Sequence, residues 1–193
     1  MKKNRAVFLD RDGTMNEEVG YLDSLDNLRL FAETSEAIKR INKSGLKAVV
    51  VTNQSGVARG YFTESFVEET HRRIQDLLKQ ADAHIDAFYY CPHHDKEGQE
   101  PYLKVCDCRK PKPGMLLKAA EDLDLDLAGS YMVGDTLKDM ETAKNTGMKG
   151  VLVRTGHFSA DQNSSDDWGT GQPDYVAADI LAAVNWIMKD CGL

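Results

Sequence analysis

Short apolar runs alternate with amphipathic stretches along this chain of 193 residues. The runs are short enough to be buried strands, and we expect strands over residues 6–9, 46–51, 85–90, 131–133 and 150–153. Strands that alternate with helices form parallel sheets with helices packed on both faces. The alternation therefore predicts an α/β fold on a parallel sheet, in which ligands bind at the carboxyl ends of the strands.

The stretches between these runs place apolar residues on one face of a helix. We expect one helix to end near Gly45, because glycine suits a left-handed C-cap, and another to begin at Thr63, whose hydroxyl can accept from a free backbone amide. The buried side of that second helix is expected to comprise Phe66, Ile74, Leu77 and Leu78. Further helices are expected from Pro113 and over residues 135–146 and 180–188.

The composition is that of an ordinary globular protein, with 41% apolar and 28% charged residues. The length allows a sizeable core without disulfides, so we expect a single domain over residues 1–193. No run of about 18 apolar residues could span a membrane, and no apolar segment before a cleavage site marks a signal peptide. We therefore expect a cytoplasmic monomer with no membrane partner, and a surface loop over the polar residues 156–173.

The net charge of −7 argues against nucleic acid as a partner, because nucleic-acid binders usually carry a basic face. It does not argue against a small phosphorylated substrate, since a metal ion and a few cations can reverse the field inside one pocket.

The first apolar run ends in two aspartates. Asp10 and Asp12 follow Phe8-Leu9 and precede Gly13, at the edge where a parallel sheet binds its ligands. A carboxylate here can act as nucleophile and metal ligand, and a second one two residues on can act as general acid and base. Taken alone, the pattern also fits an ordinary aspartate-rich turn.

Two further segments offer groups that suit phosphoryl oxygens. After the second apolar run, the hydroxyl of Thr52 and the amides that follow can hold such oxygens. Arg109 and Lys110 lie just before an expected helix start, where side-chain charge and free amides attract anions. Each segment alone also fits a solvated loop.

A second pair of acids follows the fourth run. Asp135 can complete an oxygen-ligand set for Mg²⁺ with Asp10, and Asp139 can orient these ligands from one turn into the helix. Capping of the helix by Asp135 is the alternative role for this pair.

In this order, and each after a strand, the four segments resemble the motifs of the haloacid dehalogenase (HAD) superfamily of phosphohydrolases. Those motifs are D-x-D-x-[TV], a strand-end Ser or Thr, a Lys, and G-D-x-x-x-D. The resemblance covers roughly residues 5–158. It implies a Rossmann-like sheet and phosphoester hydrolysis that depends on Mg²⁺.

The resemblance also implies a role for each matched residue. Asp10 would be the nucleophile and a ligand of Mg²⁺. Asp12 would be the proton donor and general base, with its main-chain oxygen on the metal. Thr52 and Lys110 would stabilise the phosphoryl group, and Asp135 would be the remaining protein ligand of Mg²⁺.

Cysteines cluster in one stretch of the chain. Cys91, Cys106 and Cys108 lie within 18 residues, together with His93 and His94. In a reducing cytoplasm such clustering indicates metal binding rather than disulfides. Three thiolates and one imidazole suit a closed, structural Zn²⁺ site, for which we expect Cys91, His93, Cys106 and Cys108 as ligands. His94 in place of His93, or unliganded reduced cysteines, are the alternatives.

The intervals between the motifs are too short for the large cap domain that many HAD enzymes carry. The expected zinc loop, about residues 91–108, leads directly into Arg109 and Lys110 and can shape the rim of the site instead. With the stretch Thr52-Asn53-Gln54-Ser55-Gly56-Val57-Ala58-Arg59-Gly60, these features are similar to the heptose 1,7-bisphosphate 7-phosphatases within the superfamily. The histidinol-phosphate phosphatases share the same zinc-loop plan.

That closer resemblance implies a substrate site. Arg109 is expected to bind the second, non-reacting phosphate, because a guanidinium suits bidentate contacts to oxygen. Some relatives carry Lys where this chain has Thr136, so one cationic contact is expected to be absent. The full set of expected substrate contacts is Glu18, Val19, Gly20, Tyr21, Asn53, Gln54, Ser55, Arg109 and Thr136.

The reaction expected from this resemblance is removal of the C7 phosphate of D-glycero-D-manno-heptose 1,7-bisphosphate through an aspartyl-phosphate, in ADP-heptose and lipopolysaccharide core biosynthesis. The alternative is a histidinol-phosphate phosphatase, whose pocket would face an imidazole and an ammonium group; Arg109 favours the bisphosphate. A non-catalytic, zinc-stabilised interaction module is a third hypothesis, which has no need of Asp10, Asp12 and Asp135 at strand ends. The preferred anomer stays open.

Overall fold

The computed structural model describes residues 3–157 and 168–193. Its strands are β1 (Ala6–Leu9), β2 (Lys47–Asn53), β3 (Ala87–Cys91), β4 (Tyr131–Gly134), β5 (Lys149–Val153) and β6 (Tyr175–Ala177). Its helices are α1 (Thr34–Ser44), α2 (Glu64–Lys79), α3 (Gly114–Leu123), α4 (Leu137–Asn145) and α5 (Ile180–Asp190), with short 3-10 turns at Leu25–Asn27 and Gly169–Gly171. No described helix has the length and apolar character needed to cross a membrane.

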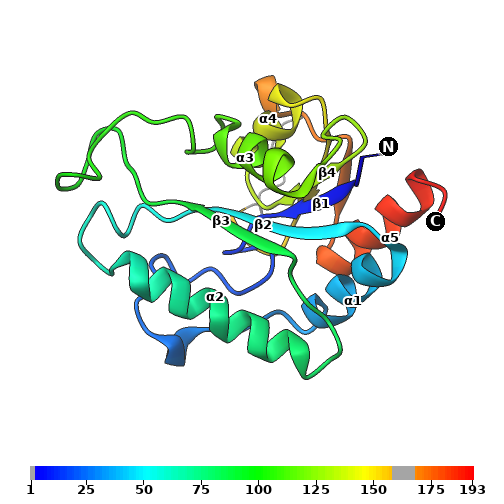
Figure 1. The fold of residues 1–193 in the computed structure, drawn as a ribbon, viewed down its shortest axis with the longest axis horizontal. Coiled ribbons are helices and arrows are strands. Elements are labelled where there is room, and N and C mark those ends of the chain that lie inside the picture. The colour runs from blue at the N-terminus through cyan, green and yellow to red at the C-terminus, as the bar shows by residue number, and fades with distance from the viewer. Residues whose placement is uncertain (1–2, 158–167) are drawn as a thin grey trace.

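The strands form one parallel sheet in the order β3-β2-β1-β4-β5-β6. Helices α3 and α4 cover one face of this sheet, and α1, α2 and α5 cover the other (Figure 1). The predicted α/β class is confirmed, and each of the predicted strands is present within two residues of its expected bounds. Among the described residues there is no large cap domain.

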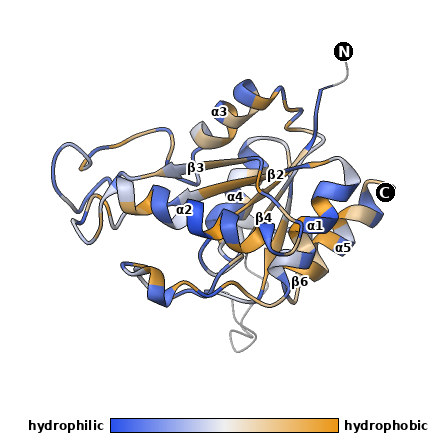
Figure 2. Ribbon diagram, turned by 60° about the horizontal axis from the view of Figure 1, so that its bottom comes forward, coloured by the Kyte–Doolittle hydropathy of each residue, from blue (hydrophilic) through white to orange (hydrophobic). Residues whose placement is uncertain are grey.

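Alternate residues of the central strand enter two separate cores. Val7 and Leu9 of β1 belong to the core under α1, α2 and α5, whereas Ala6 and Phe8 belong to the core under α3 and α4. A strand with both faces buried must be apolar throughout, which is why it appears in the sequence as a continuous run. In Figure 2 the strands are coloured mainly as hydrophobic, while α1, α2 and α5 carry both hydrophobic and hydrophilic residues.

The two expected helix ends are confirmed. Gly45 is the C-cap of α1, with a φ of 81° that favours glycine, and the hydroxyl of Thr63 accepts from the backbone amide of Phe66 at 3.2 Å. Strand β6 was not predicted, because only one of its three residues is buried and no apolar run marks it. Most of the expected surface loop at 156–173 lies outside the described residues.

The buried face of α2 differs from the expected one. Phe66 and Leu77 are only partly buried, whereas Val67, Thr70 and His71 are buried. Two of these three are polar, so a pattern of apolar residues could not select them. The hydroxyl of Thr70 is satisfied by donating to the carbonyl oxygen of Phe66 at 2.9 Å.

The imidazole of His71 is buried in the uncharged form. It stacks on Phe88 with ring centroids 4.6 Å apart, and its Nε2 has no hydrogen-bond partner among the described residues. Burial, with a further contribution from Arg11, lowers the pKa of His71 to about 3. In an unfolded chain the pKa of histidine is about 6.5. Between these two values the unfolded state binds a proton that the folded state does not, so stability falls as the pH falls.

We expect protonation at His71 to cost about 2 kcal/mol of unfolding free energy between pH 7 and pH 5. His71→Phe keeps an aromatic ring against Phe88 and removes the titrating group. Urea denaturation at both pH values should show a smaller loss in the variant than in the parent protein, by about that amount. Equal losses in the two proteins would contradict this account of His71.

Candidate active site

Polar side chains gather where the winding of the sheet reverses. β1 and β4 are neighbours at its centre, while β2 and β3 lie on one side and β5 and β6 on the other. The connections leave in opposite directions at this point, which opens a crevice at the carboxyl ends of β1 and β4. Asp10 follows β1, Asp135 follows β4, and a cavity of about 670 Å³ opens between them. Cavities of this size commonly hold small molecules.

The cavity brings together nearly all of the residues that the sequence predicts for the site. The exception is Val19, which does not line it and is 45% exposed. Those that line it are Asp10, Asp12, Glu18, Gly20, Tyr21, Thr52, Asn53, Gln54, Ser55, Arg109, Lys110, Asp135 and Thr136.

Three carboxylates share the floor of the cavity with one cation. Oxygens of Asp10, Asp135 and Asp139 lie within 4.8 Å of one another. The Nζ of Lys110 lies 2.9 Å from Asp10 and 2.6 Å from Asp139. Burial raises the pKa of Asp10 well above its usual value, and repulsion from Asp139 and Asp135 adds to this effect against the attraction of Lys110.

Burial and neighbouring charges also shift the pKa values of Asp135 and Lys110. Burial, followed by Asp139, raises the pKa of Asp135. Burial alone would lower the pKa of Lys110, but Asp10 and Asp139 outweigh it and raise that pKa. Three carboxylates, of which Asp135 and Asp139 are buried and Asp10 is partly exposed, face one ammonium group, so in their ionised forms they leave an excess of negative charge. An oxygen-rich site with such an excess fits Mg²⁺.

Asp139 is held by the start of α4. Its Oδ2 accepts from the backbone amide of Thr136 at 3.1 Å and from the Thr136 hydroxyl at 2.6 Å, while its Oδ1 accepts from Lys110. The N-cap of α4 is therefore Thr136 rather than Asp135, so the capping alternative for Asp135 is wrong. The carboxylate of Asp135 instead accepts from the backbone amide of His157 at 2.8 Å.

Two glycines make room for the Asp135 carboxylate. A Cβ on Gly13 would lie 2.3 Å from Asp135 Oδ2, and a Cβ on Gly156 would lie 2.1 Å from the same atom. Gly13 also has a φ of 78°, which other residues rarely adopt. Loops from two distant parts of the chain thus close on this carboxylate.

Asp12 is held by a set of donors beside the cluster. Arg11 donates to both of its oxygens, at 2.8 Å to Oδ2 and at 3.1 Å to Oδ1, and Asn16 and Gln54 donate at 2.9 and 2.8 Å. Burial alone would raise the pKa of Asp12, but Arg11, then Asn16 and Gln54, lower it. Gln54 Nε2 also donates to the hydroxyl of Thr52 at 2.8 Å, which links Asp12 to that residue.

The end of β2 is tied to the segment that carries Lys110. The side-chain amide of Asn53 donates to the Lys110 carbonyl oxygen at 3.1 Å, and its Oδ1 accepts from the Lys110 amide at 3.0 Å. These two hydrogen bonds fix the position of the Lys110 backbone, from which the side chain reaches the carboxylates.

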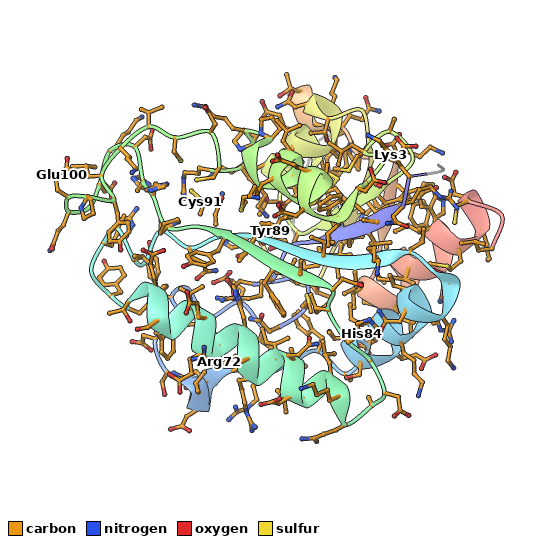
Figure 3. The ribbon with its side chains drawn as sticks, viewed as in Figure 1. Lys3, Arg72, His84, Tyr89, Cys91 and Glu100 are labelled. Carbon is orange, nitrogen blue, oxygen red and sulfur yellow. The ribbon has the colours of Figure 1, made fainter. Side chains whose placement is uncertain are left out.

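The cysteine cluster forms a compact group beyond the cavity. Its Sγ–Sγ distances are 3.5 Å for Cys91–Cys106, 3.0 Å for Cys91–Cys108 and 3.4 Å for Cys106–Cys108, and His93 Nδ1 lies 3.3 Å from Cys108 Sγ. Three cysteine sulfurs and one imidazole nitrogen, all within 4.8 Å of one another, have the ligand chemistry of a closed, tetrahedral zinc site. Figure 3 shows Cys91 where the chain leaves β3 and Glu100 at the far tip of the loop.

The cavity also contains polar residues to which the sequence analysis assigned no role there. Arg59, His94, Lys138 and His157 all line it. His157 contacts Asp135 through its backbone amide and its Nδ1, and this hydrogen bond raises the pKa of His157. Arg59 and His157 lie in loops without periodic pattern, and His94 was considered only as an alternative zinc ligand.

A family model described as HAD-hydrolase-like matches residues 107–183. The D-glycero-beta-D-manno-heptose-1,7-bisphosphate 7-phosphatase of Escherichia coli K12 is 47% identical over 166 residues, which cover 84% of this chain and 86% of that protein. The D-glycero-D-manno-heptose-1,7-bisphosphate 7-phosphatase of Thermosynechococcus vestitus is 44% identical over 186 residues, or 94% of each chain.

Solved structures show the same likeness. The D,D-heptose 1,7-bisphosphate phosphatase of B. bronchiseptica, complexed with magnesium and phosphate, superposes with a TM-score of 0.82 at 32% identity. The match covers 96% of this chain and 99% of that one.

Proposed function

The chain belongs to the D-glycero-D-manno-heptose-1,7-bisphosphate 7-phosphatases of the HAD-like hydrolases, and from this premise we propose that it removes the C7 phosphate of that sugar bisphosphate. The observation that carries the proposal is the buried group of Asp10, Asp135, Asp139 and Lys110 at the reversal point of the sheet, with Asp12 beside it. The product would supply ADP-heptose for the lipopolysaccharide core.

In the first half of the reaction, an oxygen of Asp10 attacks the phosphorus. The new bond to Asp10 forms as the bond from phosphorus to the C7 oxygen breaks, and Asp12 gives its proton to that oxygen. Mg²⁺, held by Asp10, Asp135 and the main-chain oxygen of Asp12, would supply positive charge to the phosphoryl oxygens. Lys110 and Thr52 bind the same oxygens.

In the second half, Asp12 removes a proton from water. The water oxygen bonds to phosphorus while the bond between phosphorus and Asp10 breaks, so inorganic phosphate leaves, Asp10 returns to its carboxylate, and Asp12 regains the proton that it gave up in the first half. The donors around Asp12 lower its pKa and hence favour the ionised form that this half requires, whereas the first half requires Asp12 to carry a proton. Asp139 keeps Lys110 in position throughout.

We expect phosphate release in the presence of Mg²⁺ to favour one anomer of heptose 1,7-bisphosphate over histidinol phosphate by about a hundredfold in kcat/KM, or about 2.7 kcal/mol of transition-state binding. Both anomers should be compared at matched concentrations, because the Escherichia coli relative is named for the beta anomer. Identification of the product by NMR would show whether the C1 phosphate remains. A preference for histidinol phosphate would keep the chemistry and overturn the proposed substrate.

We also propose a structural Zn²⁺ at Cys91, His93, Cys106 and Cys108. The grouping of the four ligand atoms within 4.8 Å of one another supports it. Free thiols in such a cluster are typical of a reducing compartment, which supports the cytoplasm as the place of action.

A further inference from the structure

Arg59 lines the cavity, but the chemistry described above does not use it. Its guanidinium lies over the ring of Tyr21 at 5.9 Å from the centroid, forms an ion pair with Glu97, and approaches His94 Nε2 to 3.4 Å. Its Nε is buried and has no hydrogen-bond partner in the described part of the chain. Arginine offers five N–H donors, so this contact set leaves donors for a ligand.

A second guanidinium, that of Arg109, lies in the same part of the cavity. Arg109 Nη1 donates to the carbonyl oxygen of His93 at 3.2 Å. His93 precedes His94, whose Nε2 Arg59 approaches, so both guanidiniums lie beside the same short segment of the cavity wall. Two permanent positive charges in one cavity repel each other unless an anion lies between them. Glu97 offsets this only in part, because its side chain is 60% exposed.

The zinc loop holds Arg59 in place. Gln99 donates its backbone amide to the carbonyl oxygen of Ala58 at 2.8 Å. A Cβ on Gly98 would lie 2.5 Å from the same oxygen, so the loop backbone lies directly against the residue before Arg59. This backbone contact limits the movement of Arg59 before any ligand arrives, which reduces the entropy lost on binding.

We propose that Arg59 is a second specificity-determining residue, which binds the non-reacting phosphate of the substrate together with Arg109. The inference rests on the proposed function, since it requires a sugar with two phosphates. Guanidinium groups match phosphate oxygens in charge and in planar geometry, and two of them suit one dianionic group. A sugar with one phosphate would leave this end of the cavity without its anion.

The test compares kcat/KM for heptose 1,7-bisphosphate and for heptose 7-phosphate with Mg²⁺ present. Arg59→Met retains an apolar stem against Tyr21 and removes the charge. We expect the preference for the bisphosphate to fall roughly 10- to 100-fold, the value of a hydrogen bond to a charged group. Arg59→Lys keeps the charge without the planar guanidinium, so its preference for the bisphosphate should lie between those of the parent protein and Arg59→Met. If Arg59→Met does not fold, Arg59→Lys is used in its place.

Glu97→Gln is the matched control, because it removes the ion pair and leaves Arg59 intact. The preference of this variant for the bisphosphate should stay within about threefold of the parent value, since exposed ion pairs contribute little free energy. If both Arg59→Met and Glu97→Gln slow the two substrates equally, Arg59 only braces the loop and the inference is overturned. If the parent protein itself shows no preference for the bisphosphate, the proposed substrate is overturned together with this contact.

Discussion

Asp10→Asn is expected to lower kcat by about 10⁴-fold or more, because the amide cannot form the covalent bond to phosphorus on which the proposed reaction depends. The change is nearly isosteric, so the position of the substrate should be retained and KM should change little. Phosphate release under single-turnover conditions, with the bisphosphate and Mg²⁺, measures the effect directly.

The variant should stay folded. An asparagine Oδ1 can still accept from Lys110, and loss of one buried carboxylate relieves repulsion with Asp135 and Asp139. We therefore expect the free energy of unfolding to fall by no more than about 1 kcal/mol. Asp23→Asn, at an exposed aspartate outside the cavity, is the control and should keep full activity. Turnover retained in Asp10→Asn would sink the assignment of the nucleophile.

Cys108→Ser should release the proposed zinc ion and lower the free energy of unfolding by about 3 kcal/mol. The site closes the loop between Cys91 and Cys108, and closing a loop of about this length is worth that amount of chain entropy. Activity should fall as well, because Arg109 and Lys110 directly follow Cys108 and depend on the loop for their position.

Metal content by mass spectrometry, with urea denaturation, tests this expectation. Cys191→Ser is the matched control, since Cys191 lies at the end of α5 and outside the cluster. It should retain about one zinc per chain and nearly the parent stability. Unchanged zinc content in Cys108→Ser would show that the four residues do not hold the metal together.

The central strands of the fold were predictable from the sequence for a physical reason. Burial on both faces makes a strand such as β1 apolar throughout. The rules for connections in a parallel sheet then limit the orders in which the strands can lie. The apolar pattern is lost where an element is only partly buried or where its buried face includes polar side chains. β6 has one buried residue, and the buried face of α2 includes Thr70 and His71.

The residues of the site likewise fall into those that the sequence predicts and those that it does not. Asp10, Asp135 and Lys110 follow from motifs attached to element ends, because parallel strands bring their carboxyl ends to one edge. Arg59 and His157 could not be assigned so, since each is positioned by a contact between loops: Arg59 by the zinc loop, and His157 by its hydrogen bonds to Asp135. Contacts between loops leave no regular spacing of residues in the sequence from which they could be predicted.

The place of β1 at the middle of the sheet has a consequence for synthesis on the ribosome. Asp10, the proposed nucleophile, is made early, but β4, which pairs with β1 and leads to Asp135, is made much later. A nascent chain therefore contains Asp10 long before Lys110, Asp135 and Asp139 can surround it. We therefore expect a chain that stops before residue 135 to have no phosphatase activity, because it lacks Asp135 and the strand that places this residue beside Asp10.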